Sequence, residues 1–503
     1  MEYDYVVVGA GSAGCVIASR LSEDAAVSAL LLEAGGEDTR PEIHEAAKGI
    51  SLLGSEVDWG YQTEPEAGYA GRRIGCGRGK VLGGSSSINA MVYIRGNPRD
   101  FDHWSQMGCP GWSFAEVLPY FLKSEHQERG ASAWHGVGGL LNVSDVASVP
   151  PLYAALIQAA VEIGYPLNPD FNGHTQAGAG MYQLTVKAGK RHSTAVAFLR
   201  PASGRPNLSV ATNALATRIL FDHKRAVGVA YQQGGDVLQA RVRREVIVCG
   251  GSINSPQLLL LSGLGSAGQL RAHGIDLVQD MPGVGENLHD HPTVSVVYSA
   301  LSPIPSTPEH ALGGLFLYSG IDADEPAPDL QFHYFPFSDA AASGEIAGWT
   351  VLVTHLRPES RGRVRLHSAD PAAAPAIEVN YLAHPGDLER LIAGVKIARR
   401  MCQAAALAQF RRAETAPGEG ISSDSEIEAF IRQNGWGIWH PVGTCRMGQD
   451  AGAVVDEELR VHGIQGLRVA DASVMPLVTS GNTNAPTIMI GEKAAEMVRR
   501  SWR

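Results

Sequence analysis

Short apolar runs alternate with amphipathic stretches through the first part of the chain. Residues 5–8 form a near-continuous apolar run, which is typical of a parallel strand buried on both faces of a sheet. The pattern of residues 13–21 predicts a helix, and residues 29–32 predict a second strand. Another strand–turn–helix unit follows in "REVIVCGGSINSPQLLLLSGLG". This alternation predicts an α/β fold with a parallel sheet.

The later part of the chain has a different pattern. "RGRVRLHS" and "AIEVNYL" alternate polar and apolar residues as half-buried strands do, and "DLERLIAGVKIARRMCQAA" has the spacing of an amphipathic helix. The Pro and Asp content of "SGIDADEPAPD" predicts a surface loop. No internal repeat is visible, so these segments are not copies of the first unit.

Composition and charge narrow the class of protein. The chain has 503 residues, of which 44% are hydrophobic, and this suits two or three domains with large buried cores. Its formal charge of −11 and lack of long basic runs argue against binding to nucleic acid or to an anionic membrane. The six cysteines show no CxxC spacing, and no signal peptide or membrane-spanning apolar run is recognisable. We expect a soluble, reduced, cytoplasmic protein.

The first predicted strand leads into a dinucleotide-binding pattern. Gly9, Gly11 and Gly14 give G-x-G-x-x-G, and Glu33 ends the second strand. In such sites the first glycine allows a tight turn, the second lets the backbone approach a pyrophosphate, and the third lets helix and strand pack closely. The helix N-terminus favours phosphate charge, and Glu33 can accept hydrogen bonds from a ribose diol. The motif predicts a dinucleotide site and leaves both NAD and FAD open.

Two further segments are rich in small residues. "GRGKVLGGSSSINAMVYIRG" fits either a flexible loop or a backbone that lies against a flat, bulky cofactor and its phosphates. "GSINSPQLLLLSGLG" is the turn and helix of the second strand–turn–helix unit. Together with the C-terminal "HPVGTCRMG" and "SGNTNAPTIMIGEKAAE", these segments resemble signatures of the glucose–methanol–choline (GMC) family of FAD-dependent oxidoreductases. The chain is most similar to bacterial choline-dehydrogenase-like and hydroxymethylfurfural-oxidase-like members.

The resemblance implies an alcohol oxidoreductase that holds FAD in the N-terminal site. It implies a Rossmann-type FAD-binding domain from residues 1–150, 185–292 and 434–503, and a substrate domain with an antiparallel sheet from residues 151–184 and 293–433. Some relatives attach FAD through a histidine just before the asparagine of the first signature. Here that position is Ile88, so we expect non-covalent FAD. The glycine motif and the resemblance give these cofactor-binding residues: Gly9, Gly11, Ser12, Ala13, Gly14, Glu33, Val81, Gly84, Ser85, Asn89, Ala90, Met91, Val92, Ala216, Asp471, Ala472 and Thr483.

The same resemblance assigns catalytic roles to two polar residues near the C-terminus. His440, in "GIWHPVGTC", matches the family's base, and Asn482, the first asparagine of "NTNAP", matches its second polar residue; Asn484 ranks lower. Alcohol oxidation removes a hydroxyl proton and a carbinol hydride, and an imidazole with an unperturbed pKa of about 6.5 suits the proton. We expect FAD to accept the hydride at N5, His440 to take the proton, and the Asn482 amide to stabilise the alkoxide.

The sequence gives less support to other functions. His289, Asp290 and His291 in "NLHDHP" allow a metal site, but no recognised ligand spacing supports one. A serine hydrolase needs G-x-S-x-G after a strand, which "GSSSIN" and "GGSIN" do not supply. An FAD-containing lyase or decarboxylase of the same fold is the alternative, together with a protein that only binds FAD. His440 argues against the decarboxylase branch, which has another residue at that position.

The substrate and the electron acceptor are less closely defined. Trp439, beside the base, and Phe332, Tyr334 and Phe335 in "QFHYFPF" are candidates for a pocket, although aromatic residues at such positions are more often sheet core. An apolar pocket suits primary alcohols with aromatic, furanic or aliphatic tails, whereas choline needs a carboxylate and an aromatic cage that the sequence does not place. Packing near the flavin, including Ile438, governs the reaction with O2. An oxidase is slightly favoured over a dehydrogenase with another acceptor, and the oligomeric state stays open.

Overall fold

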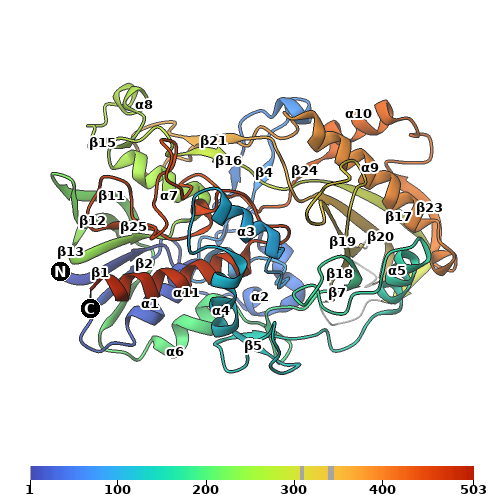
Figure 1. Ribbon diagram of the computed structural model, residues 1–503, viewed down its shortest axis with the longest axis horizontal. Coiled ribbons are helices and arrows are strands. Elements are labelled where there is room, and N and C mark those ends of the chain that lie inside the picture. The colour runs from blue at the N-terminus through green and yellow to red at the C-terminus, as the bar shows by residue number, and fades with distance from the viewer. Residues whose placement is uncertain (1, 306–310, 338–344, 503) are drawn as a thin grey trace.

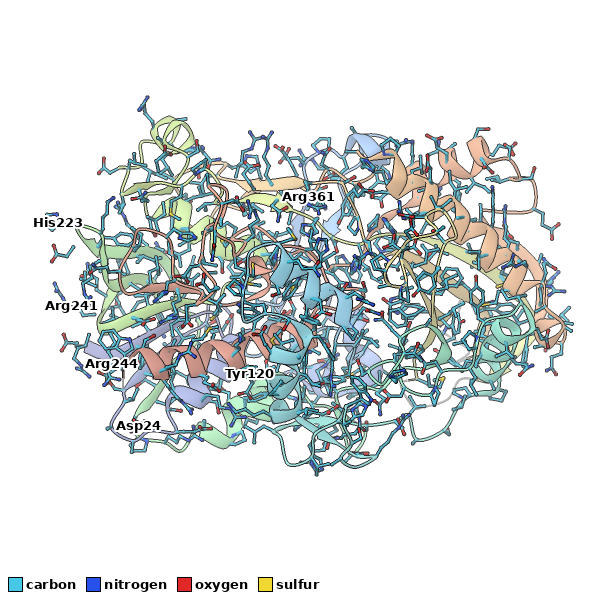
Figure 2. The ribbon with its side chains drawn as sticks, viewed as in Figure 1. Asp24, Tyr120, His223, Arg241, Arg244 and Arg361 are labelled. Atoms are coloured by element: carbon cyan, nitrogen blue, oxygen red, sulfur yellow. The ribbon has the colours of Figure 1, made fainter. Side chains whose placement is uncertain are left out.

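Two seven-stranded sheets organise the protein, one in each half of an elongated molecule (Figure 1). The computed structural model describes residues 2–305, 311–337 and 345–502. Both chain ends lie in the half that carries the first sheet (Figure 1). Charged side chains such as Asp24, His223 and Arg241 point outward at that end of the molecule (Figure 2).

The first sheet is built on the parallel strands that the sequence predicts. β1 (Glu2–Val8) lies between β2 (Ala29–Leu32) and β13 (Asp236–Val248) and is parallel to both. α1 (Gly14–Leu21) packs on β1 and β2, which explains why these strands are apolar on both faces. The predicted α/β fold is confirmed. The sheet is completed by β10 (Leu208–Ala211), β25 (Leu467–Val469), β12 (Arg225–Gln233) and β11 (Leu215–Asp222).

The second sheet is antiparallel and has one face covered by helices. α9 (Pro385–Cys402), the helix predicted from its amphipathic pattern, packs on β17 and β20 of this sheet, and α5 (Pro151–Glu162) packs on β18 and β7. The strands, in spatial order, are β23 (Arg411–Ala416), β17 (Pro292–Pro305), β20 (Glu345–His355), β19 (Leu330–Phe337), β18 (Gly313–Leu317) and β7 (Gly178–Met181), with β24 (Trp436–Gly437) paired to β17.

"RGRVRLHS" and "AIEVNYL" form strands as predicted, but outside the second sheet. β21 (Gly362–Arg365) and β22 (Ala376–Glu378) join β16 (Glu286–Leu288) in a separate three-stranded sheet. The alternation of polar and apolar residues matches the two faces of this sheet, because Val364 and Ile377 are buried on one face while Arg363 pairs with Glu378 on the other.

The remaining helices frame the two halves. They are α3 (Pro98–Gln106), α4 (Phe114–Ser124), α7 (Gly251–Leu261), α8 (Ala267–Ala272), α10 (Asp424–Asn434) and α11 (Asn484–Ser501), together with the short α2 (Pro41–His44) and α6 (Arg200–Ala202). The predicted loop "SGIDADEPAPD" connects β18 to β19 without regular structure and is mostly exposed. Among the described residues, no helix is both long enough and apolar enough to cross a membrane.

The division into domains remains our proposal. The strands of the first sheet come from the segments assigned to the FAD-binding domain, 1–150, 185–292 and 434–503. Those of the second sheet come from segments 151–184 and 293–433, except β24 and the first residue of β17. This distribution supports the proposed division.

Candidate active site

A cavity of about 890 Å³ runs between the two large sheets. One end is formed by the loop between β1 and α1, and the other by β19 and β20. Both His440 and Asn482 line it. Ligand sites commonly have volumes of roughly 300–1,000 Å³, so this cavity has room for a large cofactor or for a cofactor part and a substrate.

The glycine loop has the geometry that a pyrophosphate requires. Gly9 has a φ of +101°, and a Cβ there would lie 2.4 Å from the carbonyl oxygen of Cys249. A Cβ on Gly14 would lie 1.9 Å from the Gly9 carbonyl oxygen, so this glycine lets helix and strand pack closely. A Cβ on Gly11, by contrast, would meet no atom within 4 Å. Gly11 lines the cavity and leaves room for a ligand to approach the backbone.

Glu33 ties the second strand to this loop. Its carboxylate accepts hydrogen bonds from the backbone N–H groups of Ala10, at 2.8 Å, and Gly35, at 2.9 Å. Burial raises the pKa of Glu33 to about 7, and the two backbone N–H groups oppose that rise. The side chain lines the cavity, where a sugar hydroxyl can reach the remaining lone pairs of its oxygens.

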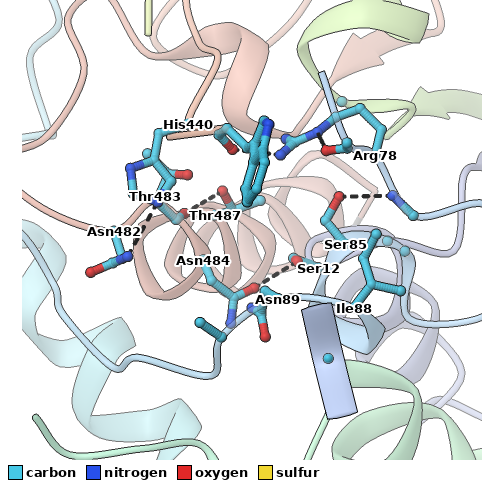
Figure 3. Close-up of a pocket in the computed structure, with 18 of the residues that line it drawn as sticks. Ser12, Arg78, Ser85, Ile88, Asn89, His440, Asn482, Thr483, Asn484 and Thr487 are labelled. Carbon is cyan, nitrogen blue, oxygen red and sulfur yellow. Dashed lines mark hydrogen bonds between the residues drawn. The ribbon is translucent and has the colours of Figure 1, made fainter. Parts of the chain in front are cut away.

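Most of the expected cofactor-binding residues line this one cavity (Figure 3). The two that do not are Gly14, at the helix–strand contact, and Val81, which is fully buried and forms a β-bridge with Gly36. Val81 therefore holds its segment against the end of β2. The residues that line the cavity are Gly9, Gly11, Ser12, Ala13, Glu33, Gly84, Ser85, Asn89, Ala90, Met91, Val92, Ala216, Asp471, Ala472 and Thr483.

The segment around Asn89 is fixed by its own polar contacts. Asn89 Oδ1 accepts hydrogen bonds from the backbone N–H of Met91, at 3.0 Å, and from Nη1 of the buried Arg191, at 2.8 Å. Met91 has a φ of +62°, a conformation that costs a residue other than glycine about 1–3 kcal/mol. These contacts hold a strained stretch of backbone against the cavity.

Two helix N-termini meet at the same place. Ser12, just before α1, donates a hydrogen bond from Oγ to Asn484 Oδ1 in the first turn of α11, at 2.7 Å (Figure 3). Neither helix has an acidic residue in its first turn, so their positive ends face the cavity unneutralised. Asp471, at the end of β25, is bonded to Gly251 N and Ser255 Oγ and so connects this strand to α7.

His440 is held on three sides. Its backbone N–H donates to Asp290 Oδ1 at 2.6 Å, its Nδ1 lies 3.0 Å from Nδ1 of His291, and its Nε2 lies 3.2 Å from the amide nitrogen of Asn482 (Figure 3). The preceding Trp439 has a φ of +65°. Strained backbone of this kind persists where the surroundings hold it firmly, as they do at many functional sites.

The segment "NLHDHP" supports the His440 loop. Asp290 accepts hydrogen bonds from the backbone of His440 and His291 and from the Tyr381 hydroxyl, and His289 pairs through its backbone with Val442. Within the part of the chain that the structure describes, no three His, Cys, Asp or Glu side chains are arranged to hold a metal ion. Sequence reasoning did not find the support that Asp290 and His291 give to His440.

The surroundings keep His440 uncharged. Burial lowers its pKa well below the ordinary value of 6.5, and the nearby His291, His333 and Arg78 lower it further. A neutral imidazole at neutral pH can accept a proton. The same burial lowers the pKa of His291 and that of His333 to about 3.

Successive side chains of β19 point to opposite faces, so some of the aromatic pocket candidates lie in the core and others line the cavity. Phe332 and Tyr334 point into the core under α9, whereas Phe335 lines the cavity. The intervening His333 points the same way as Phe335 and was missed, although the two-residue period of a strand places it there. Trp439 and Ile438 also line the cavity. Other apolar lining residues include Leu53, Trp59, Leu152, Ile304, Leu312, Leu352 and Trp436.

Charge is distributed unevenly along the cavity. Among the described lining residues, the carboxylates are Glu33 and Asp471, and both accept hydrogen bonds from backbone N–H groups. Arg78 is the one Arg or Lys of that lining; it donates hydrogen bonds to the carbonyls of Gly77 and Trp439 beside the base. The cavity wall near His440 therefore carries the Arg78 cation, and the nearest carboxylate is that of Asp290, which is buried behind this wall and interacts electrostatically with Arg78.

The structure combines a dinucleotide-type glycine loop on a parallel sheet with a cavity that extends to an antiparallel sheet. Family models described as GMC oxidoreductase match residues 3–293 and 358–491. The chain belongs to the GMC oxidoreductase family and is an FAD-dependent oxidoreductase acting on CH–OH donors.

Curated relatives are similar over almost the whole chain. An oxygen-dependent choline dehydrogenase of Paraburkholderia xenovorans is 44% identical, covering 99% of this chain and 94% of the relative. An alcohol dehydrogenase [acceptor] of Pseudomonas putida is 45% identical, covering 99% and 96%. Among solved structures, pyridoxine 4-oxidase from Mesorbium loti matches with a TM-score of 0.93 and 32% identity over 99% of both chains. Aspergillus oryzae formate oxidase matches with a TM-score of 0.90 and 27% identity, covering 100% of this chain and 98% of the other.

Proposed function

We propose that the protein oxidises an uncharged primary alcohol to the aldehyde, with His440 as the base. The observation that carries this proposal is the convergence of His440 Nε2 and the Asn482 amide nitrogen, 3.2 Å apart, in a cavity continuous with the dinucleotide loop. An acceptor for a proton and a donor for an alkoxide are the two groups that this reaction needs.

The side chains have separate tasks in this reaction. FAD, when bound, accepts the carbinol hydride at flavin N5. His440 takes the hydroxyl proton at Nε2, because its depressed pKa keeps that nitrogen unprotonated at neutral pH. The Asn482 amide donates to the substrate oxygen as negative charge develops on it. The positive end of α11, at Thr483 and Asn484, stabilises negative charge on the same side of the cavity.

Residues of the first sheet and of the loops and helix ends beside it would hold FAD without a covalent bond. We assign the phosphates to the loop around Gly11 and Ser12, the adenosine ribose to Glu33, and the adenine to the region of Ala216. Residues 84–92 and 471–484 would hold the flavin. Ile88, which lines the cavity, offers no nucleophile for attachment.

The walls near the base favour an uncharged substrate. They combine apolar side chains such as Phe335, Leu352 and Trp436 with the cation of Arg78. A quaternary ammonium group would lose its hydration there without gaining a carboxylate from the described lining. An aliphatic or aromatic tail gains hydrophobic burial in the same space.

For the electron acceptor we favour O2. The support is the full-length similarity to a solved relative named as an oxidase, pyridoxine 4-oxidase. Ile438, in the cavity wall beside the base, is the residue whose packing we expect to influence access of O2. Rapid reoxidation of the reduced flavin in air is the expected result, and slow reoxidation would indicate another acceptor.

Replacement of His440 tests the assigned base. We expect His440→Ala to retain FAD and to slow flavin reduction by alcohol by at least about 10²-fold, since general-base help is typically worth about 10²–10⁴-fold. His223→Ala, a change at a histidine whose side chain is 97% exposed, is the matched control and should leave the rate unchanged. Normal reduction by His440→Ala would remove His440 from this role.

A further inference from the structure

A chain of buried hydrogen bonds runs from the second sheet to the base. Gln331, on β19, donates from Nε2 to the Tyr182 hydroxyl at 3.1 Å and to Asn482 Oδ1 at 3.4 Å. Asn482 then reaches His440 Nε2, and His440 Nδ1 reaches His291. Neither Tyr182 nor Gln331 lines the cavity, and both are almost completely buried.

Tyr182 determines which groups donate and which accept along this series of hydrogen bonds. Its hydroxyl donates to the carbonyl oxygen of Phe332 at 2.8 Å. A hydroxyl has one proton, so Tyr182 can only accept from Gln331. Burial raises the pKa of the phenol, which keeps the proton in place. Gly314 on β18 makes room for this contact, because a Cβ there would lie 1.9 Å from the Tyr182 oxygen and 2.1 Å from the Phe332 oxygen.

The Tyr182 hydroxyl determines the orientation of the Gln331 amide. Since the phenol oxygen accepts, the amide nitrogen of Gln331 must face it, and the same nitrogen faces Asn482 Oδ1. Among the described residues, Oε1 of Gln331 has no hydrogen-bond partner. A flipped amide would leave two N–H groups unpaired at that position instead of one oxygen, which is the costlier arrangement in a buried site.

The orientation of Gln331 in turn fixes Asn482 and His440. With Oδ1 of Asn482 occupied by Gln331, the Asn482 NH2 group faces His440 Nε2. An NH2 group only donates, so Nε2 must be the unprotonated nitrogen and the proton lies on Nδ1. His440 then donates from Nδ1 to Nδ1 of His291 at 3.0 Å. This arrangement puts the His291 proton on Nε2, which is buried and has no hydrogen-bond partner among the described residues, and the two contacts of Asn482 offset that cost.

We propose that Tyr182 and Gln331 are positioning residues that orient the Asn482 amide and thereby hold the proton of His440 on Nδ1. This inference rests on the proposed function, because only the tautomer with a free Nε2 can take the substrate proton. In the reaction, the alcohol O–H bond breaks and its proton forms an N–H bond at Nε2, while the hydride leaves the carbinol carbon for the flavin. The opposite tautomer has Nε2 already protonated and is inactive as a base.

Two variants interrupt this series of hydrogen bonds without altering a residue that lines the cavity. Tyr182→Phe removes the group that sets its direction, and Gln331→Met removes the link to Asn482 with little change of volume. We expect each to slow the limiting rate of anaerobic flavin reduction by about 5- to 10-fold, the equivalent of one buried hydrogen bond. The alcohol dissociation constant and FAD content should stay unchanged, because no lining residue is altered. Thr354→Val is the matched control, since it removes a buried hydroxyl opposite Gln331 on β20 whose one hydrogen bond to a described residue is with Thr293.

The decisive readout is coupling to Asn482. If Tyr182 and Gln331 act through the amide, neither substitution slows an Asn482→Ala enzyme further, and the double variant Tyr182→Phe/Gln331→Met is no slower than the worse single one. A structural role predicts losses that add and that persist in the Asn482→Ala enzyme. Additive losses, or an unchanged rate in both single variants, would overturn the inference.

A measurement on the parent enzyme serves if the buried replacements fail to fold. The ring 15N chemical shifts of His440 should show a proton on Nδ1 and a bare Nε2 at neutral pH, and a proton on Nε2 would overturn the inference. Failure of the parent enzyme to be reduced by any alcohol would overturn the proposed function itself. Reduction of the parent together with unaltered variants would overturn only the positioning roles.

Discussion

We predict that the cavity discriminates between alcohols mainly by their charge. Choline and its tert-butyl isostere, in which a tert-butyl group replaces the trimethylammonium group, have nearly the same shape and differ by one positive charge. Several curated relatives of this chain are named as choline dehydrogenases. We nevertheless predict that the tert-butyl isostere is the better substrate, because Arg78 lines the cavity beside the base and no carboxylate of the described lining faces it.

The size of this preference follows from the charge of Arg78. Two like charges about 8 Å apart in a partly buried site with an effective dielectric constant of about 20 repel by about 2 kcal/mol, and the buried Asp290, whose pKa is raised by burial, offsets only part of this repulsion. A free energy of about 2 kcal/mol corresponds to a factor of about 30 in kcat/KM. The unpaired desolvation of the ammonium group adds to this factor in the same direction.

The assay is the ratio of kcat/KM for the two alcohols in three enzymes. The parent should favour the tert-butyl isostere by about 30-fold or more, Arg78→Lys should keep that preference, and Arg78→Gln should lose most of it. The charge-conserving Lys variant separates an electrostatic effect from a packing effect. A parent enzyme that prefers choline, or a ratio that is the same for the Lys and Gln variants, would refute the reasoning.

Three further predictions concern the cofactor and the pH. Acid precipitation should release free FAD, because Ile88 offers no attachment point, and pigment that stays with the pellet would contradict this. Gly11→Ala should fold normally, because its Cβ meets no atom, but FAD titration should show binding about 10-fold weaker or worse. Gly14→Ala should instead lower the thermal midpoint in calorimetry, because its Cβ meets the backbone of Gly9. Stability should fall as the pH drops from 7 to 5, because His291 and His333 have pKa values of about 3 when folded and ordinary values near 6.5 when unfolded. Protons then favour the unfolded chain by about 2 kcal/mol per histidine, and equal urea midpoints at the two pH values would contradict this.

The sequence predicted the nucleotide half of the fold well because its signals are local. The apolar runs of β1 and β2 and the glycines between β1 and α1 lie within a few dozen residues of one another. The second sheet was expected only from the family resemblance, since its strands are joined through long-range antiparallel pairing that no local pattern reports. The position of β21 and β22 in a separate sheet depends on their pairing with β16, from a distant part of the chain.

The candidate site, too, was predictable only where local sequence patterns report it. His440 and Asn482 could be chosen from motifs, but their support could not, because Asp290 and His291 are about 150 residues away in sequence. Strand alternation alone would have placed His333 beside Phe335, so this residue was within reach of sequence reasoning. Tyr182 and Gln331 carry no motif, and only the directions of their hydrogen bonds connect them to the base.

Anaerobic mixing of the purified protein with a panel of uncharged primary alcohols tests the central claim most directly. The account predicts that at least one aliphatic or aromatic alcohol bleaches the yellow flavin absorbance and yields the aldehyde, and that His440→Ala bleaches at least about 10²-fold more slowly. A flavin that stays oxidised with every alcohol would contradict alcohol oxidation and would favour a lyase or decarboxylase of the same fold.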